Sequence, residues 1–532
     1  MTTPQSYEDR DYQIEAENNT LNFISRFPDR HPIIAIPTGA GKSKILGSII
    51  QKYLDRYTDH KVLILSHVES ILAQDTEAVL TIGIDPAKVG IYSAGLGFRK
   101  RRQVTIAGIH SIYKKGELFE DIDLVIIDEC HSIPTRGEGM YRKFFESCQA
   151  PRIGLTATPF RRSHGYLHRG KGSMFTDICY DLTALHSFNK LVDQGYLCKL
   201  IAKCPDMQVD VSSARTTAGD YNLQDLSNIV DRAEITQAAL DEVFVHRHSR
   251  KKWLIFAIDI EHCKNIRNTL TSMGISAKAL HSKMKEDRQE VESEFKQDKF
   301  QALVSVGMVT TGFDAPNIDL IVLLRPTKSP VLHIQMVGRG LRISPGKANC
   351  LVMDFAGNIE RLGPINDVQI RTPKRGQKKS KVPVRKCPTC KTYCHISLKQ
   401  CPECGFLFPI QEKLKIKSGE SEVVRSSQDV KMVRWLDVDR ITYGFHRKAG
   451  KMPSMKVTYH VGMNRFDEYI CYDHGGYAGH KAKHWVKQRV QPGMELPEDV
   501  IDLVKHCELL SKPKSIYLDT SQKYPTITNV KF

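Results

Sequence analysis

Long apolar runs are missing from this sequence of 532 residues. No stretch approaches the roughly 18 consecutive apolar residues of a membrane-spanning helix, which excludes that class of protein. The first residues, MTTPQSYEDRDYQ, are polar and acidic and lack the charged-then-apolar layout of a secretory signal peptide. No unit of roughly 20–50 residues is repeated, which excludes a solenoid. We therefore expect a globular protein of a cytoplasmic compartment.

Disulfide bonds are not expected, although the chain has 14 cysteines. Without a secretory signal the compartment should be reducing, so free thiols plus one metal site fit better. Acidic residues are also in the minority, with 60 Asp and Glu against 77 Lys and Arg and a net charge of +17. This excess suits a partner made of phosphates, because each neutralised phosphate releases counterions. A basic surface that only aids solubility is the alternative.

The order of the apolar runs predicts an α/β fold with several domains, because one core rarely supports a chain of this length. Near-continuous apolar runs that end in small or polar residues are typical of buried parallel strands. They occupy 61–67, 102–110, 123–129 and 152–158, and the pattern resumes at 253–258, 301–307 and 318–324. Between about 160 and 230 the sequence favours an exposed excursion.

Two parallel-sheet domains in tandem are predicted, followed by smaller modules. The sheet domains should occupy 1–190 and 191–368, a basic linker 369–386, a cysteine-rich module 387–408 and a small α+β module 409–532. The stretch 371–386 carries eight basic residues and almost no large apolar ones, a composition typical of linkers.

A glycine-rich loop follows the first apolar strand and opens a helical pattern, with the sequence Pro37-Thr38-Gly39-Ala40-Gly41-Lys42-Ser43. Its glycines let backbone amides turn towards phosphates, and the helix start adds positive potential. Lys42 would reach the β- and γ-phosphates of ATP, and Ser43 would hold Mg²⁺. The strict pattern has glycine where this chain has Ile36. A glycine-rich turn with a chance lysine is the alternative for an isolated match.

An acidic pair supports the nucleotide prediction. Asp128 and Glu129 follow the apolar run 124–127 directly. Asp128 would bind Mg²⁺, and Glu129 would orient and deprotonate the attacking water. Acidic residues after a strand are usually only solvated, but the loop upstream favours catalysis.

These motifs resemble those of superfamily 2 helicases of the DEAD/DEAH-like type, and most closely those of RadD-type bacterial helicases and their phage relatives. The resemblance covers about residues 8 to 365 and implies two RecA-like domains with ATP between them. It makes 128–131 the DEAH-like box and places Gln13 where the family carries its adenine-reading glutamine. It also implies a bacterial cytoplasm, or that of the host for a phage protein.

The resemblance implies roles for further residues. Contacts with the nucleic-acid backbone are expected from Ser66, His67, Gln74, His110, Ser111, Thr310 and Thr311. Residues 156–161 resemble the segment that couples hydrolysis to nucleic-acid binding. Nucleotide contacts in the second domain are expected from Gly312 and Asp314. The motif that supplies arginine fingers contains Gln335, Arg339 and Arg342.

Two CxxC pairs predict a small zinc ribbon. They comprise Cys387, Cys390, Cys401 and Cys404. Four thiolates at this spacing suit tetrahedral Zn²⁺, and Gly405 permits the second tight turn. Cys394 or His395 could replace one ligand, and a redox dithiol is the rival interpretation. Loss of the ribbon is expected to spare the fold of the motor.

Two further segments are candidate contacts for nucleic acid. The basic run 371–386 leads into the ribbon, and Phe406 and Phe408 follow it as candidate platforms for unpaired bases. A simple tether is the alternative. Residues 472–485 mix histidine, lysine and aromatic residues, although Trp485 is more typical of a core position.

The leading hypothesis is an ATP-dependent DNA helicase or translocase that serves recombination, replication or repair, with single-stranded or branched DNA as substrate. An RNA helicase is the alternative within the enzyme class, because the DECH box does not distinguish the sugars. A third hypothesis is an ATP-switched adaptor that docks on single-strand-binding or recombination proteins through its C-terminal region. A restriction-type translocase is less consistent, because the remaining segments show no paired-carboxylate nuclease motif beside a lysine.

Overall fold

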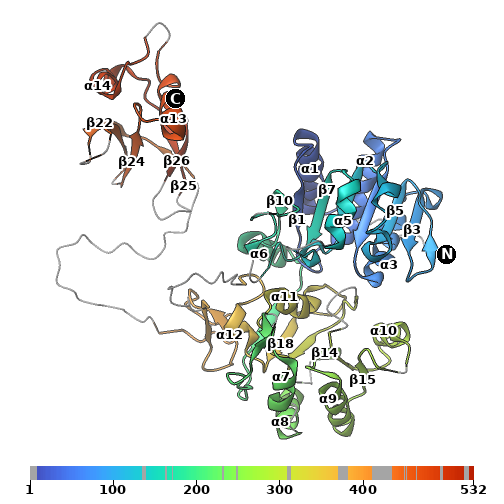
Figure 1. Cartoon of the computed structure of the whole chain (residues 1–532). Helices are drawn as coiled ribbons and strands as arrows, with labels where there is room; N and C mark the ends of the chain where they lie inside the picture. Colours follow the sequence, from blue (N-terminus) through green and yellow to red (C-terminus); the bar gives the residue numbers. More distant parts are fainter. Residues whose placement is uncertain are drawn as a thin grey trace. The chain divides into compact units, whose positions relative to one another are not determined.

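The computed structural model (Figure 1) describes residues 9–134, 139–161, 165–170, 172–217, 219–230, 233–246, 250–284, 286–307, 313–368, 382–409, 434–447, 450, 452–462, 464–491, 495–519 and 526–532. The chain divides into two compact units, Met1–Glu412 and Lys413–Phe532. Among the helices of these ranges, none has the length and apolar character needed to cross a membrane.

The first unit begins with an eight-stranded sheet of order β10-β1-β7-β6-β2-β5-β3-β4. All neighbours are parallel except β3 and β4. Its strands are β1 (Pro32–Ala35), β2 (Val62–Ser66), β3 (Val89–Ser93), β4 (Phe98–Arg99), β5 (Val104–Gly108), β6 (Leu124–Ile127), β7 (Arg152–Thr156) and β10 (Asp177–Asp181). The four runs predicted as buried parallel strands form β2, β5, β6 and β7, which confirms their assignment.

Helices cover both faces of this sheet. Alternate strand residues such as Ile34 and Ile64 pack against α1 (Asp11–Arg26), α2 (Lys42–Arg56), α3 (Glu69–Thr81) and α6 (Leu185–Asp193). The other face, with Leu63 and Val125, packs against α4 (Ile109–Ile112) and α5 (Met140–Ser147). The strands are buried on both sides, which is why their sequences are continuously apolar.

A second, six-stranded parallel sheet has the order β11-β18-β17-β14-β16-β15. Its strands are β11 (Leu200–Lys203), β14 (Trp253–Phe256), β15 (Ala277–Leu280), β16 (Ala302–Ser305), β17 (Leu320–Leu323) and β18 (Cys350–Asp354). One face packs on α8 (Ala233–Val245) and α9 (Ile260–Ser272), and the other on α10 (Arg288–Lys296), α11 (Pro330–Gly338) and α12 (Asn358–Leu362). The two RecA-like domains in tandem are therefore confirmed.

The stretch from 160 to 230 is not the single exposed excursion that its glycines and histidines predict. It holds two small hairpins, β8 (Phe160–Arg161) with β9 (Gly165–Tyr166) and β12 (Thr216–Thr217) with β13 (Asp220–Tyr221), and the helix α7 (Leu223–Val230). Between the hairpins, β10 pairs with β1 and β11 pairs with β18. Helix α6 crosses position 190, and its Phe188 and Leu191 belong to the first core. The structure of this region is therefore determined by pairing with strands that are distant in the sequence, and local composition does not reveal such pairing.

The cysteine-rich module is attached to the second sheet. Its hairpin joins β19 (Val384–Lys386) and β20 (Tyr393–His395), and Thr392 forms a bridge to Lys203 at the end of the outermost strand β11. The amide of Cys204 donates to the Lys391 carbonyl at 2.9 Å. Tyr393 is buried in the core of the second domain. The module is therefore a continuation of this domain.

The second unit is a small α+β fold. Its two antiparallel sheets contain β21 (Arg434–Asp437), β25 (Ser515–Asp519) and β26 (Thr526–Lys531), and β22 (Arg440–His446), β23 (Ser454–Val461) and β24 (Asn464–Ile470). Helices α13 (Gly476–Lys487) and α14 (Val500–Lys505) pack with one face of β22–β24 in a single core. The predicted α+β module has this architecture within its described residues.

Candidate nucleotide and zinc sites

The predicted phosphate-binding loop lies between β1 and α2, at the carboxyl end of the strand that lies next to the edge strand β10. It lines a cavity of about 340 Å³ together with Asp128 and Glu129. The second domain contributes four polar side chains to the same cavity, namely Asp314, Gln335, Arg339 and Arg342. The structure therefore brings these predicted site residues from both domains to one place. The neighbouring Gly312 lies outside the described residues.

Two glycines lie in close contact with side chains on either side of the loop. A Cβ on Gly41 would lie 2.5 Å from Gln13 Nε2. Gly41 also has a φ of +75°, a backbone conformation that favours glycine. A Cβ on Gly338 would lie 3.1 Å from the Cβ of Thr38. The start of α1 therefore packs on the loop from one side, and the end of α11 from the other. The hydroxyl of Tyr12 also donates to the Ala40 carbonyl at 3.1 Å.

Lys42 joins the loop to the acidic pair. Its Nζ lies 2.8 Å from Asp128 Oδ1 and 2.5 Å from Glu129 Oε1. Burial alone would lower the pKa of Lys42, but the two carboxylates outweigh it and the net shift is upward. Burial would raise the pKa of Glu129, yet Lys42 and His131 hold it well below its usual range. Lys42 and Glu129 are thus fixed in their charged forms.

Oxygen donors for a magnesium ion line the same cavity. The Ser43 hydroxyl and the Asp128 carboxylate come from the loop and the strand end. Oxygen ligands of this kind suit Mg²⁺, which is bound through few protein groups plus phosphates and water. These residues therefore fit the metal that the sequence predicts.

Glu129 has an unusual backbone, with φ 48° and ψ 46° in the left-handed region. Such a conformation is uncommon outside glycine and occurs often at functional sites. The next turn carries His131, whose Nδ1 lies 3.1 Å from Glu129 Oε2 and 2.9 Å from the Thr156 hydroxyl. His131 Nε2 lies 3.2 Å from Gln335 Nε2 in the second domain. His131 therefore links the acidic pair, the 156–161 segment and the other domain.

Two arginines face the acidic pair from the second domain. Arg339 Nη1 donates to the Phe313 carbonyl at 2.5 Å, and Arg342 Nη1 donates to the same oxygen at 3.0 Å. Burial and the like charge of Arg342 lower the pKa of Arg339 to about 9. Two desolvated guanidinium groups side by side favour an anion between the domains.

Sequence reasoning missed a fourth carboxylate at this site. Asp75 on α3 is only 1% exposed, and its Oδ2 has no hydrogen-bond partner within the described chain. Burial and the nearby charge of Asp128 raise its pKa well above the usual range. The signal was present, because Asp75 lies one helical turn from Ile71 and from Val79 on the buried face of α3.

The residues predicted to contact nucleic acid lie in two places. Ser66 ends β2 and pairs in register with Gly108, so His67 and the 110–111 pair meet at the carboxyl ends of adjacent strands. Ser66 is buried, whereas His110 is exposed. Gln74 lines the nucleotide cavity. Thr310 and Thr311 lie outside the described residues.

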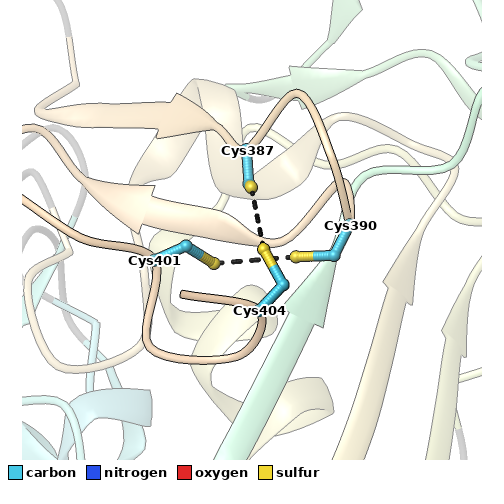
Figure 2. A group of neighbouring side chains, drawn as sticks. All are labelled: Cys387, Cys390, Cys401 and Cys404. Carbon is cyan, nitrogen blue, oxygen red and sulfur yellow. Dashed lines mark hydrogen bonds between the residues drawn. The ribbon is translucent and has the colours of Figure 1, made fainter. Parts of the chain in front are cut away.

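The four ribbon cysteines converge (Figure 2), and their sulfur atoms all lie within 4.8 Å of one another. The Cys387–Cys404 and Cys390–Cys401 sulfurs are 3.5 and 3.6 Å apart. A Zn–S bond of about 2.3 Å requires sulfur atoms about 3.8 Å apart in a tetrahedron. The donor set therefore fits Zn²⁺.

The other candidates around the ribbon differ from this group. Cys394 is buried with its sulfur 3.8 Å from that of Cys401, and it directs its thiol towards the Thr392 carbonyl. The Nδ1 of His395 lies 2.6 Å from the Ser397 hydroxyl. Phe408 is buried under Arg385, so it is not the open platform for bases that the sequence suggested. Of the basic run 371–386, residues 371–381 lie outside the described residues, whereas 384–386 are not linker but form β19 of the ribbon hairpin.

Attachment of the ribbon to the second domain changes the expected effect of metal loss. Chelation, or Cys401→Ser, should lower the unfolding midpoint of the motor by about 4–8 °C, which corresponds to about 2 kcal/mol in a domain of this size. The reason is that Tyr393 and the Lys386–Glu360 and Lys391–Asp206 ion pairs lose their support. Scanning calorimetry measures the shift, with Cys471→Ser as the control. An unchanged midpoint after metal removal would instead show that the ribbon folds independently of the motor, as the sequence predicts.

Comparison with known proteins agrees with this geometry. Residues 6–161 match the family described as the res subunit of type III restriction enzymes, and residues 235–344 match the helicase conserved C-terminal domain. Two RecA-like domains with a shared nucleotide cavity define a helicase motor. The chain belongs to superfamily 2 of the helicases, of the DEAD/DEAH-like type, whose motor domains hydrolyse ATP.

Relatives come from several sources. IRC3 of Saccharomyces cerevisiae, named as an ATP-dependent helicase, is 29% identical over 65% of this chain and 51% of its own length. A 51.5 kDa protein of a Lactococcus phage is 26% identical over 72% of this chain and 79% of that protein. An HsdR fragment from Vibrio vulnificus shares the fold, with 21% identity, a TM-score of 0.52 and coverage of 69% and 68%. The chain spans about half of IRC3, and its closer likeness to RadD-type helicases stays a prediction.

Proposed function

We propose that this protein is an ATP-dependent DNA translocase or helicase that serves recombination, replication or repair, with single-stranded or branched DNA as its substrate. The observation that carries the proposal is the single cavity that holds Lys42, the acidic pair and the arginines of the other domain. Relatives named as an EcoAI restriction subunit and as a 3′-5′ DNA translocase, XPB2, support DNA as the track.

Lys42 and the backbone of the loop would hold the phosphates, and Gln13, which lies against Gly41, would contact the adenine. Mg²⁺ at Ser43 and Asp128 would neutralise charge on the phosphates. Glu129 accepts the proton of the attacking water. Its lowered pKa keeps it ionised for this task. Arg339 and Arg342 stabilise the charge that develops on the transferred phosphoryl group, and Asp314 orients Arg342 through their ion pair.

The link between chemistry and movement passes through His131. It contacts Glu129, Thr156 and Gln335 together, so a change around the phosphate shifts contacts in both domains. Nucleic acid is held at the strand ends by His67, His110 and Ser111. Closure and opening of the two domains then moves these contacts along a strand.

The test is the steady-state rate of ATP hydrolysis without nucleic acid and with single-stranded, duplex or forked DNA or with RNA, at fixed salt. Stimulation by one DNA form supports the proposal and identifies the track. Stimulation by RNA alone favours an RNA helicase. Equal rates of ATP hydrolysis under all these conditions would contradict a translocase mechanism and favour the adaptor hypothesis.

Lys42→Ala should weaken ATP binding by roughly 10- to 100-fold, because a charge-assisted contact with phosphate is lost. The substitution also leaves the buried carboxylate of Asp128 and the half-buried carboxylate of Glu129 without their cation. Titration with a fluorescent ATP analogue measures the loss. Lys114→Ala removes an exposed lysine of the same domain and serves as the control. Equal affinity of the two variants would contradict the role of Lys42.

A further inference from the structure

The helix α13 of the second unit has one face that consists of basic and polar residues only. Its exposed residues between 480 and 488 are His480, Lys481, Lys483, His484, Lys487 and Gln488. At 100° per residue these positions occupy one continuous arc of the helix. The helix contains no acidic residue. Within the described chain, none of its three lysines forms an ion pair.

This arc is fixed by the buried side of the helix. The indole Nε1 of Trp485 donates to Glu468 Oε2 at 2.9 Å, and Ala482 and Val486 pack in the core. Arg489 is only 2% exposed and stacks on the Trp485 ring at 3.9 Å. Trp485 and Tyr472 are thus core residues, and the lysines cannot rotate into the protein without breaking these contacts.

We propose that this face of α13 binds the phosphate backbone of the DNA on which the motor acts. The proposal rests on the proposed function for its partner. From His480 to Lys487 the helix rises about 10 Å, which matches about three phosphates of one strand at 3.4 Å each. A row of unpaired lysines binds such a row with release of counterions.

Charge and shape favour nucleic acid over other anionic partners. A membrane-bound helix inserts its apolar face, but here that face is buried in the core of the unit. A docked peptide is usually held by apolar or aromatic anchors at its centre. The exposed side chains from 480 to 488 include none. The face can therefore read charge and spacing, and it carries no group arranged to read bases.

The test compares two variants of the full chain that lose the same charge. One carries Lys481→Ala, Lys483→Ala and Lys487→Ala on α13. The control carries Lys505→Ala, Lys512→Ala and Lys514→Ala, which are exposed lysines elsewhere in the same unit. Alanine favours helix, so α13 should remain folded, and the unfolding midpoint verifies this. Binding of fluorescein-labelled oligothymidylate and of a labelled duplex is measured over a series of salt concentrations.

The α13 variant should bind at least one DNA about 10-fold more weakly, with a salt slope smaller by about 2 for single strands. Its ATPase rate at saturating DNA should equal that of the wild type. The control should bind as the wild type does. Equal losses in both variants, or none in either while DNA still stimulates the ATPase, would overturn this proposal and leave the proposed function intact. Binding to phosphatidylglycerol vesicles is measured in parallel, and an α13 variant that loses only vesicle binding while it binds both DNAs normally would also overturn the proposal. A wild-type chain that neither binds DNA nor responds to it would instead refute the proposed function.

Discussion

Glu129→Gln should bind ATP with nearly wild-type affinity and hydrolyse it about 10²- to 10⁴-fold more slowly. The amide keeps the shape of the side chain and can still contact Lys42, but it cannot accept a proton from water. Lys42 and His131 hold the pKa of Glu129 low despite burial, so its carboxylate is ionised and carries no proton that would block this role. Its left-handed backbone fixes the carboxylate at the edge of the cavity. Single-turnover hydrolysis, with nucleotide binding measured separately, gives both quantities.

Glu117→Gln is the matched control, because Glu117 is exposed on the same domain. Its hydrolysis rate should equal that of the wild type. Equal ATP turnover by Glu129→Gln and wild type would refute the assignment of the general base. Asp75 would then be the carboxylate to test next, since it is buried beside the same pair.

Arg339→Gln should reduce kcat by about 10³-fold or more, with a smaller change in the KM for ATP. The guanidinium lies in the second domain and can stabilise phosphoryl charge only when the domains are closed. Burial and the neighbouring Arg342 already lower its pKa to about 9, so an anion relieves an unfavourable arrangement. Steady-state kinetics at saturating DNA measures the effect.

Arg339→Lys separates charge from geometry. It keeps a positive charge but loses the planar fork, so an intermediate rate is expected. Because Arg339 also donates to the Phe313 carbonyl, unfolding midpoints of both variants must lie near that of the wild type. Normal kcat in a folded Arg339→Gln protein would contradict the arginine-finger role.

The motor fold could be predicted because its strands are buried on both faces. Runs such as 124–127 therefore have no polar residue to mislead the assignment. Strands at the sheet edges were missed for the opposite reason. β11 and β15 are four residues long, and most of their side chains are only half-buried. Their pairing depends on distant partners, which local sequence patterns do not contain.

The nucleotide site was predictable where chemistry fixes residue type and spacing, as in the loop around Lys42 and at Asp128 and Glu129. The contacts between residues from different parts of the fold could not be predicted from the sequence. His131 stood in the DECH box, but its contact with Gln335 requires both domains to be in place. The position of Tyr393 could not be predicted either. Nothing in its local sequence distinguishes it from other residues of the ribbon, yet it packs in the core of the second motor domain.

The position of the ribbon beside β11 has a consequence for the behaviour of the chain in concentrated solution. β11 is the outermost strand of its described sheet, and exposed edge strands readily pair with strands of other chains. The Thr392–Lys203 bridge and the Cys204 amide bond occupy part of the backbone beside this edge. A bound metal ion would thus help to keep individual molecules apart, and a chain deprived of it would be prone to self-association.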